Sequence, residues 1–421
     1  MATHLASRIC RGLLGRVAWV LCVAMITGCG VLPRESAVPA SQTSEASVMH
    51  SSNYRYWPAL NVDPLYEAAI AATERERHYR TGAGYKDDQL PPASYLAISG
   101  GGDDGAFAAG IMVGWTLHGD RPEFKVVTGI SAGALIAPFV FLGPRYDSVL
   151  RDVSVSIGSK DIFHVRGLIR AIFSDAFADD RPLASLIAKY VTSSLLSAVA
   201  EQYERGRDLF IGTTDLDSGQ AVVWNMGEIA KSQAPGALKL FRQIMLASAS
   251  IPGVFPPVMI EVMARGKTHQ EMHVDGGVTT EVFLFPASFI NDITADRGTL
   301  RRERDVYVIR NGRVGPVWRS VPRRTIIVGR RALDRLLDAQ GLDDLYRLQT
   351  ISREEHEEFH VAYIGDDFSY PPHRAFDAEY MHRVFDYSVG LAAAGGAWHA
   401  ALPSVERSRT WISSSSGAHR P

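Results

Sequence analysis

Cysteine is almost absent from this chain. Only three occur in 421 residues, Cys10, Cys22 and Cys29, and all lie near the N-terminus. A domain that begins after Cys29 therefore has no thiol for a disulfide or a thiolate metal site. The chain also lacks an excess of either charge, with 44 Lys and Arg against 46 Asp and Glu, and it has no long basic block. We therefore expect no nucleic-acid partner.

The N-terminus has the pattern of an export signal. Arg8, Arg11 and Arg16 precede an apolar run at residues 17–27, and small residues follow it. This run is shorter than the roughly 20 apolar residues that a membrane-spanning helix needs. We therefore expect residues 1–28 to be a removable signal and not a permanent membrane helix.

The end of this signal resembles the lipobox of bacterial lipoproteins. In Ile26-Thr27-Gly28-Cys29, cleavage would leave Cys29 as the first residue, and its thiol would carry a lipid. Gly30 is not the aspartate associated with retention in the inner membrane, so the resemblance implies an exported lipoprotein in the outer membrane that faces the periplasm. The alternative is an ordinary signal peptide with a chance cysteine.

Composition divides the rest of the chain into four parts. Residues 29–53, which follow the signal and are rich in Ser, Ala and Pro, are expected to be a flexible tether. Residues 54–93 are expected to form a helical extension, with a helix at residues 64–80. We predict a catalytic domain at residues 94–400 and a flexible tail at residues 401–421.

Two strand–turn–helix units stand at the start of the predicted catalytic domain. A strand at residues 94–99 precedes a helix at 106–117, and a strand at 124–128 precedes a helix at 134–142. Such units in series indicate a three-layer α/β/α fold with a mostly parallel central sheet. Further strands are predicted at 208–212, 221–224, 258–262, 305–310, 325–328 and 359–364, and a late helix at 338–356.

The second unit contains the motif Gly129-Ile130-Ser131-Ala132-Gly133, which fits G-x-S-x-G. Glycines on both sides of a serine allow a sharp turn that holds its hydroxyl clear of neighbouring side chains. The turn also places Ser131 at a helix N-terminus, where unpaired N–H groups favour developing negative charge. Ser131 is therefore a candidate nucleophile.

The first unit contains Gly100-Gly101-Gly102-Asp103-Asp104-Gly105. A dinucleotide-binding turn would need an acidic residue about 20 positions on, where the sequence instead has Thr128 to Ser131. As an oxyanion loop, Gly101 and Gly102 would direct backbone N–H groups at a carbonyl oxygen that becomes negative. This interpretation explains both glycine motifs together, and we prefer it.

A third motif, His273-Val274-Asp275-Gly276-Gly277, ends a short apolar stretch in a carboxylate and two glycines. By itself it is typical of a plain turn. It also suits a base that a turn presents to the nucleophile.

Together these motifs resemble the three signature blocks of the patatin-like phospholipase family, in the same order. A fourth block at residues 247–257, Ala-Ser-Ala-Ser-Ile-Pro-Gly-Val-Phe-Pro-Pro, resembles the stretch before the family's aspartate. The resemblance covers residues 94–282. It implies that Ser131 is the nucleophile, Asp275 its base in a two-residue dyad, and residues 100–102 (Gly100, Gly101 and Gly102) the oxyanion loop. It also implies a phospholipid or other acyl-ester substrate and no cofactor or metal.

One position departs from the family pattern. Asp104 stands where the family's glycine loop usually has Arg or Lys. We therefore expect its side chain either to point away from the oxyanion or to be neutralised by a partner.

Two other functions stay open. An α/β-hydrolase with a Ser, His, Asp triad would take its base from one of several histidines without a motif. These are His356, His360, His373, His382 and His399. Alternatively, a non-catalytic lipid-binding or scaffolding lipoprotein would keep the fold without turnover.

Overall fold

The computed structural model describes most of the chain between Arg34 and Pro403. The described ranges are residues 34–85, 90–155, 164–165, 178–285, 302–373 and 376–403. The expected export signal, Cys29 and nearly all of the expected tail lie outside them.

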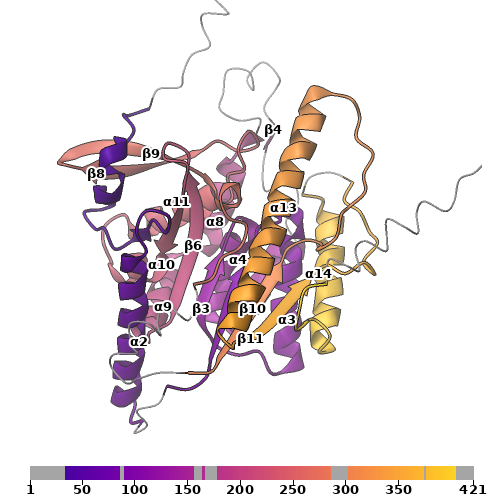
Figure 1. Ribbon diagram of the computed structural model, residues 1–421, viewed down its shortest axis with the longest axis horizontal. Helices are drawn as coiled ribbons and strands as arrows, with labels where there is room; N and C mark the ends of the chain where they lie inside the picture. Colours follow the sequence, from indigo (N-terminus) through magenta and orange to yellow (C-terminus); the bar gives the residue numbers. More distant parts are fainter. Residues whose placement is uncertain are drawn as a thin grey trace, which may run out of the picture.

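A nine-stranded sheet runs through the middle of the described part (Figure 1). Five neighbouring strands are parallel, in the order β6-β3-β2-β10-β11. Their bounds are Asp208–Asp215 (β6), Phe124–Gly129 (β3), Ala93–Ile98 (β2), Arg304–Arg310 (β10) and Glu358–Tyr363 (β11). The parallel half confirms the expected fold class.

The other strands of this sheet are antiparallel to their neighbours. They are β1 (Arg55–Tyr56), β7 (Gln220–Asn225), β8 (Val258–Ala264) and β9 (Lys267–Asp275). The short strands β4 (His164–Val165) and β5 (Ala178–Asp179) form a separate pair.

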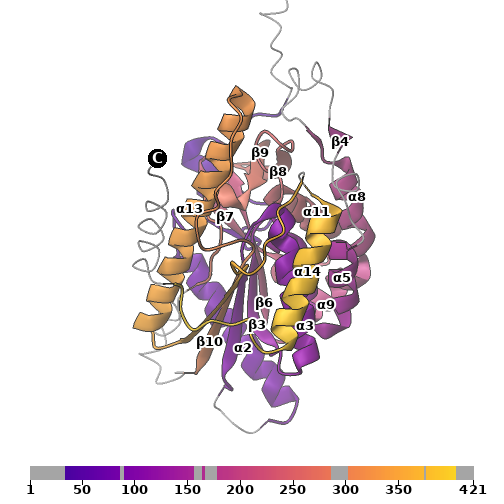
Figure 2. The same ribbon diagram turned by 90° about the vertical axis from the view of Figure 1, so that its right-hand side faces the viewer.

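Helices cover both faces of the sheet, as Figure 2 shows with α13 on one side and α3 and α14 on the other. Along β2, Leu96 and Ile98 belong to one buried cluster, and Tyr95 and Ala97 to the other. Because both faces of this strand are buried, its sequence is apolar throughout. Two helices cover the second cluster: α2 (Asp63–Gly82) and α13 (Thr325–Glu354). The other helices cover the first cluster: α3 (Gly105–His118), α4 (Ala132–Leu142), α5 (Asp147–Val155), α8 (Arg181–Tyr190), α9 (Ser193–Glu204), α10 (Met226–Lys231), α11 (Ala237–Ser248) and α14 (Ala378–Ala393).

Two strands share one edge of β6, and this arrangement positions the site. Strand β3 pairs with β6 as far as Gly129 opposite Ile211, and β9 continues along the same edge with Asp275 opposite Thr213. The other edge of β6 is occupied by β7. The ends of β3 and β9 therefore meet on one strand.

Residues 34–53 are packed and not a flexible tether. The helical turn η1 (Ala40–Glu45) precedes a backbone bridge from Ser47 to Met263 on β8, and Ala46 and Val48 are buried. Arg34 forms an ion pair with Asp217 in the β6–β7 turn. Composition missed this segment because its few apolar side chains have no regular spacing.

Two further predictions differ from the structure. Residues 325–328, expected as a strand, begin the long helix α13, because a short β-branched run does not distinguish a strand from a helical turn. The expected helical extension also contributes β1, which joins the main sheet beside β7.

Among the described residues, no single helix is long and apolar enough to cross a membrane. Helices α8 and α9 reach the necessary length and composition only together, as a pair bent by 64°.

Candidate active site

Ser131 occupies a strained turn between β3 and α4. Its φ of 53° lies in the left-handed region, which is unfavourable for a residue with a side chain. The flanking glycines are required by packing: a Cβ on Gly129 would lie 2.7 Å from Gly133 O, and one on Gly133 would lie 2.4 Å from Ile98 O. The turn therefore has the features expected of a nucleophile elbow.

The side chains of Ser131 and Asp275 meet directly. Ser131 Oγ donates a hydrogen bond of 2.6 Å to Asp275 Oδ2. The other carboxylate oxygen, Oδ1, accepts a bond of 2.8 Å from the Gly277 N–H. Both side chains are buried, with residue exposures of 6% for Ser131 and 5% for Asp275. The structure thus brings together the two residues that were predicted from the sequence to form a dyad.

Burial gives the carboxyl of Asp275 the character of a base at neutral pH. Desolvation raises the pKa of Asp275 to about 7, and the hydrogen bonds from Ser131 and Gly277 oppose this shift. A general base is most effective when its pKa lies near the working pH. Asp275 can therefore accept a proton from Ser131 without a histidine.

Two serines of the fourth sequence block, residues 247–257, form hydrogen bonds with the backbone of the dyad residues. Ser248 Oγ accepts a hydrogen bond from the Ser131 N–H and donates one to Gly212 O on β6. Ser250 O accepts a bond of 3.0 Å from the Asp275 N–H. Both serines are fully buried. This block holds the backbone of both dyad residues, a role that its sequence alone did not reveal.

The glycine loop lies beside the nucleophile, but its three glycines are not equivalent. Gly102 lines the same cavity as Ser131. The Gly100 N–H donates to Glu281 O at 3.2 Å, so this amide already has an acceptor. The expectation for Gly100 is thereby corrected: it shapes the loop, while the N–H groups of Gly101 and Gly102 remain the oxyanion candidates.

Asn311, at the end of β10, holds this loop in place. Its side-chain N–H donates to Ser99 O at 2.8 Å, and its Oδ1 accepts from Ala108 N at 3.0 Å. A Cβ on Gly101 would lie 2.2 Å from Asn311 O, so the two backbones approach too closely for any other residue at position 101. Asn311 was not predicted from the sequence, although its place directly after a predicted parallel strand was a usable signal.

The two aspartates of the loop bind the start of α14. Asp104 accepts a hydrogen bond from Tyr380 Oη, and Asp103 accepts one of 2.7 Å from the Phe376 N–H. Burial raises the pKa of Asp104 to about 6, which the Tyr380 hydroxyl opposes. Asp104 therefore has a partner and is not directed at an oxyanion.

A third carboxyl group, from Glu281, lies against the dyad. Its Oε2 is buried and has no hydrogen-bond partner among the described residues, and the nearest guanidinium atom, Arg310 Nη1, is 3.6 Å away. Burial raises the pKa of Glu281 to about 7, Arg310 opposes this, and the charge of Asp275 adds to it. No sequence motif predicts Glu281, whose carboxyl group contributes to the electrostatics of the site.

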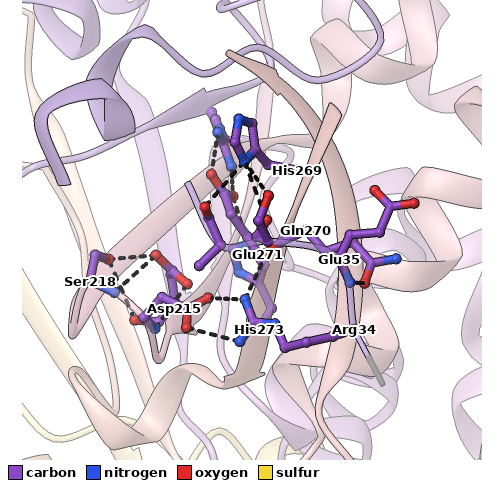
Figure 3. Close-up of polar contacts among 12 residues, drawn as sticks. Arg34, Glu35, Asp215, Ser218, His269, Gln270, Glu271 and His273 are labelled. Carbon is purple, nitrogen blue, oxygen red and sulfur yellow. Dashed lines mark hydrogen bonds and ion pairs between the residues drawn. The ribbon is translucent and has the colours of Figure 1, made fainter. Parts of the chain in front are cut away.

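Behind Asp275, β9 carries a buried polar network (Figure 3). His273 Nε2 lies 3.1 Å from Glu271 Oε2, and Nδ1 lies 3.0 Å from Thr213 Oγ1. Glu271 also forms a buried ion pair with Arg55 of β1. Burial alone would raise the pKa of Glu271, but Arg55 and His273 lower it to about 2. This network fastens β9, and with it Asp275, to the neighbouring strands.

An apolar cavity opens beside Ser131. Helices α4 and α8 contribute most to its lining, and α3, α5, α11, α14 and the loop after α11 contribute further residues. Its apolar lining residues include Leu135, Ile136, Phe139, Leu183, Leu186, Ile187, Val191, Met245, Ile251, Phe255, Phe376 and Met381. A cavity with one polar end at Ser131 suits an extended hydrocarbon chain that carries a reactive ester.

The five histidines of the alternative triad lie elsewhere. His360 stacks on Tyr307, and the other four make contacts that do not involve Ser131. Within the described ranges, no group of three or more His, Cys, Asp and Glu side chains could hold a metal ion. The hydroxyl of Ser131 has Asp275 as its partner instead.

Comparisons with known proteins agree with the sequence blocks. Residues 96–287 match the family model described as patatin-like phospholipase. Among solved structures, VipD from Legionella pneumophila is similar, with 12% identity over 72% of this chain and 67% of that chain and a TM-score of 0.30. ExoU from the type III secretion system of Pseudomonas aeruginosa, solved with SpcU, shows 15% identity over 75% and 55%, with a TM-score of 0.29. This chain thus spans little more than half of the ExoU chain. No curated protein matches the sequence.

Proposed function

Residues 96–287 match the family model of the patatin-like phospholipases, and from this premise we propose that the protein is a serine acyl hydrolase that cleaves acyl esters of lipids. The observation that carries the proposal is the 2.6 Å hydrogen bond from Ser131 Oγ to a buried carboxylate, Asp275, at one end of an apolar cavity. A nucleophile, its base and a site for an acyl chain are then adjacent.

The reaction has two halves. Ser131 Oγ attacks the ester carbonyl carbon and passes its proton to Asp275, while the N–H groups of Gly101 and Gly102 bind the oxyanion. The tetrahedral intermediate collapses, the alcohol leaves with the proton from Asp275, and an acyl-serine remains. Asp275 then takes a proton from water, and the water oxygen attacks the acyl-serine. As the carbonyl carbon–Oγ bond breaks, Asp275 returns this proton to Ser131 Oγ, so the fatty acid leaves and the dyad is regenerated.

The substrate is a phospholipid or lysophospholipid with one acyl chain in the cavity. Apolar walls contribute affinity for a hydrocarbon chain but do not select a head group. With the acyl chain in the cavity, the ester group would lie at its polar end, beside Ser131 and Gly102.

Labelling with a fluorophosphonate probe tests the proposal directly. We expect the purified full-length protein to become labelled at Ser131 and to hydrolyse a short-chain ester, and Ser131→Ala to lose both. The matched control is Ser197→Ala, an exposed serine on α9, which keeps both. A folded wild-type protein that neither reacts nor hydrolyses would instead favour the non-catalytic lipid-binding lipoprotein.

We also propose that Cys29 carries a lipid and that the protein is an exported lipoprotein of the outer membrane facing the periplasm. The lipobox-like sequence Ile26-Thr27-Gly28-Cys29 supports this. Mass spectrometry of the N-terminal peptide should find the added lipid on Cys29, and Cys29→Ala should abolish it. An unmodified Cys29 in membrane-fraction protein would refute the anchor.

A further inference from the structure

The segment that leads into α13, together with its first turns, carries positive charge and exposed apolar side chains. Residues 317–336 contain six arginines, one aspartate (Asp334) and no Lys or Glu. Trp318 is 86% exposed. Four other apolar side chains here are also exposed: Val317, Ile327, Val328 and Leu336. We call residues 317–336 the basic end of α13.

Three of these arginines have no ion-pair or side-chain hydrogen-bond partner among the described residues. Arg319, Arg323 and Arg324 are exposed. In the part of the chain that the structure describes, none of the three forms an ion pair or a side-chain hydrogen bond. The upper end of α13 extends beyond the edge of the sheet in both views (Figures 1 and 2). These charges are therefore presented to an external partner.

The first turns of α13 lie near the glycine loop. The charge of Arg330 reaches Asp103 of the glycine loop, where it opposes the rise in pKa that burial causes. Further along α13, Asp338 binds Arg310, which faces Glu281 beside the dyad. A partner bound to this surface would therefore lie on the same side of the molecule as the glycine loop.

We propose that the basic end of α13 is a docking surface for an anionic phospholipid bilayer. The choice of a lipid surface rests on the proposed function, because the substrate of a lipid hydrolase lies in such a surface. The side chains fit it: clustered arginines bind anionic head groups, and Trp beside exposed aliphatic residues is typical of the membrane interface.

Charge argues against a second copy of this chain as the occupant. A symmetric dimer places the same patch on both subunits. Residues 317–336 would then bring together two sets of six arginines with one aspartate each, and like charges at such an interface are repulsive. An anionic surface removes this repulsion.

Trp318 itself is the probe for the test. The full-length protein is reconstituted into vesicles that contain brominated phosphatidylglycerol, which quenches tryptophan on contact. We expect a quenched component that is absent in Trp318→Phe and weaker in vesicles of brominated phosphatidylcholine. Unquenched Trp318 in the anionic vesicles would overturn the proposal, as would its shielding by self-association without lipid.

Charge reversal tests the arginines. We expect Arg323→Glu with Arg324→Glu to lower the quenching of Trp318 and to weaken the salt-sensitive part of vesicle binding by about tenfold or more. The matched control reverses Lys231 and Lys239, two exposed lysines on α10 and in α11, and leaves quenching unchanged. The milder pair Arg323→Gln with Arg324→Gln is used if the reversed protein unfolds. Equal losses in test and control would refute a local surface.

Failure of the docking surface and failure of the proposed function give different results. Ser131→Ala should lose hydrolysis and keep the quenching of Trp318. The Arg323 and Arg324 variants should keep hydrolysis of a soluble short-chain ester and lose turnover of vesicle lipid. Quenching without any ester hydrolysis would leave the surface standing and reject the enzyme. Ester hydrolysis without quenching of Trp318 would reject the docking surface and leave the proposed enzyme activity standing.

Discussion

Glu281 and Asp275 lie against the same glycine: a Cβ on Gly277 would be 2.5 Å from Glu281 Oε1 and 3.1 Å from Asp275 Oδ1. Two buried carboxyl groups this close do not titrate independently, because a negative charge on one raises the pKa of the other. The protonation of the base therefore depends on a residue that does not touch Ser131 in the described contacts.

Glu281→Gln should shift the pH dependence of hydrolysis. The change removes a negative charge near Asp275, so the pKa of Asp275 falls and the acidic limb of the kcat/KM profile moves to lower pH. A stopped assay from pH 5 to pH 9 measures it. Glu261→Gln, on an exposed position of β8, is the control and should keep the wild-type profile. An unchanged profile for Glu281→Gln would exclude the coupling.

Asp275→Asn should reduce kcat on the order of 10²–10⁴-fold, because Ser131 loses its base. The amide keeps the shape of the side chain and can still accept the hydrogen bond from Gly277 N–H. Steady-state hydrolysis of a soluble ester is the measurement, and circular dichroism confirms folding. Turnover close to that of the wild type would remove Asp275 from the mechanism.

The same variant should change how stability depends on pH. The pKa of Asp275 is raised from its ordinary 3.8 to about 7 in the folded protein. Between these values the unfolded chain ionises while the folded chain keeps its proton, so rising pH disfavours the fold. Asn does not ionise. The Tm difference, Asp275→Asn minus wild type, should therefore be more positive at pH 8 than at pH 4, and a difference that is constant with pH would contradict the raised pKa.

Gly101→Ala should reduce kcat/KM by about 10²–10³-fold through displacement of the glycine loop. The new Cβ would collide with Asn311 O at 2.2 Å, and φ is 153° at this position. Gly84→Ala is the control, since Gly84 also has a positive φ but open space around it. If both variants lost activity equally, the cause would be backbone strain in general and not the loop.

Tyr380→Phe should destabilise the protein by about 1–3 kcal/mol, because the carboxyl group of Asp104 loses the hydrogen bond that the Tyr380 hydroxyl donates. Tyr387→Phe on the same helix is the matched control, since its bond to Asp367 is exposed to solvent. Thermal or urea unfolding measures both. A loss for Tyr380→Phe no larger than that of the control would show that Asp104 does not need this partner.

Local patterns predicted the fold class and the positions of the candidate dyad. The turns around Ser131 and Asp275 depend on neighbouring glycines, and such short-range requirements are visible in sequence. Strands β2 and β3 were predicted within a residue or two for the same reason. The roles of Ser131 and Asp275 are still predictions that the experiments above test.

What could not be predicted depends on contacts between distant segments. Arg310 and Asn311 reach the glycine loop because β10 pairs with β2, and Glu281 reaches it through the hydrogen bond that its carbonyl oxygen accepts from the Gly100 N–H. The packing of residues 34–53 on β8 likewise has no periodic signal, because irregular backbone is fixed by individual hydrogen bonds such as the one from Ser47 N to Met263 O. Helix α14 is amphipathic but was not singled out, although it supplies Tyr380.

The shared edge of β6 has a consequence for how such a protein can diversify. Ser131 and Asp275 are 144 positions apart in the chain, yet Gly129 and Asp275 occupy registers only two residues apart on one strand. Changes in α8 can therefore remodel one wall of the cavity without moving the reacting atoms, provided that the β9 register and the contact of Ser248 with Ser131 are kept. A slip of one residue in β9 would instead turn the carboxylate to the opposite face of the sheet. Libraries that aim at new acyl specificity should accordingly vary α8 and leave β6, β9 and Ser248 untouched.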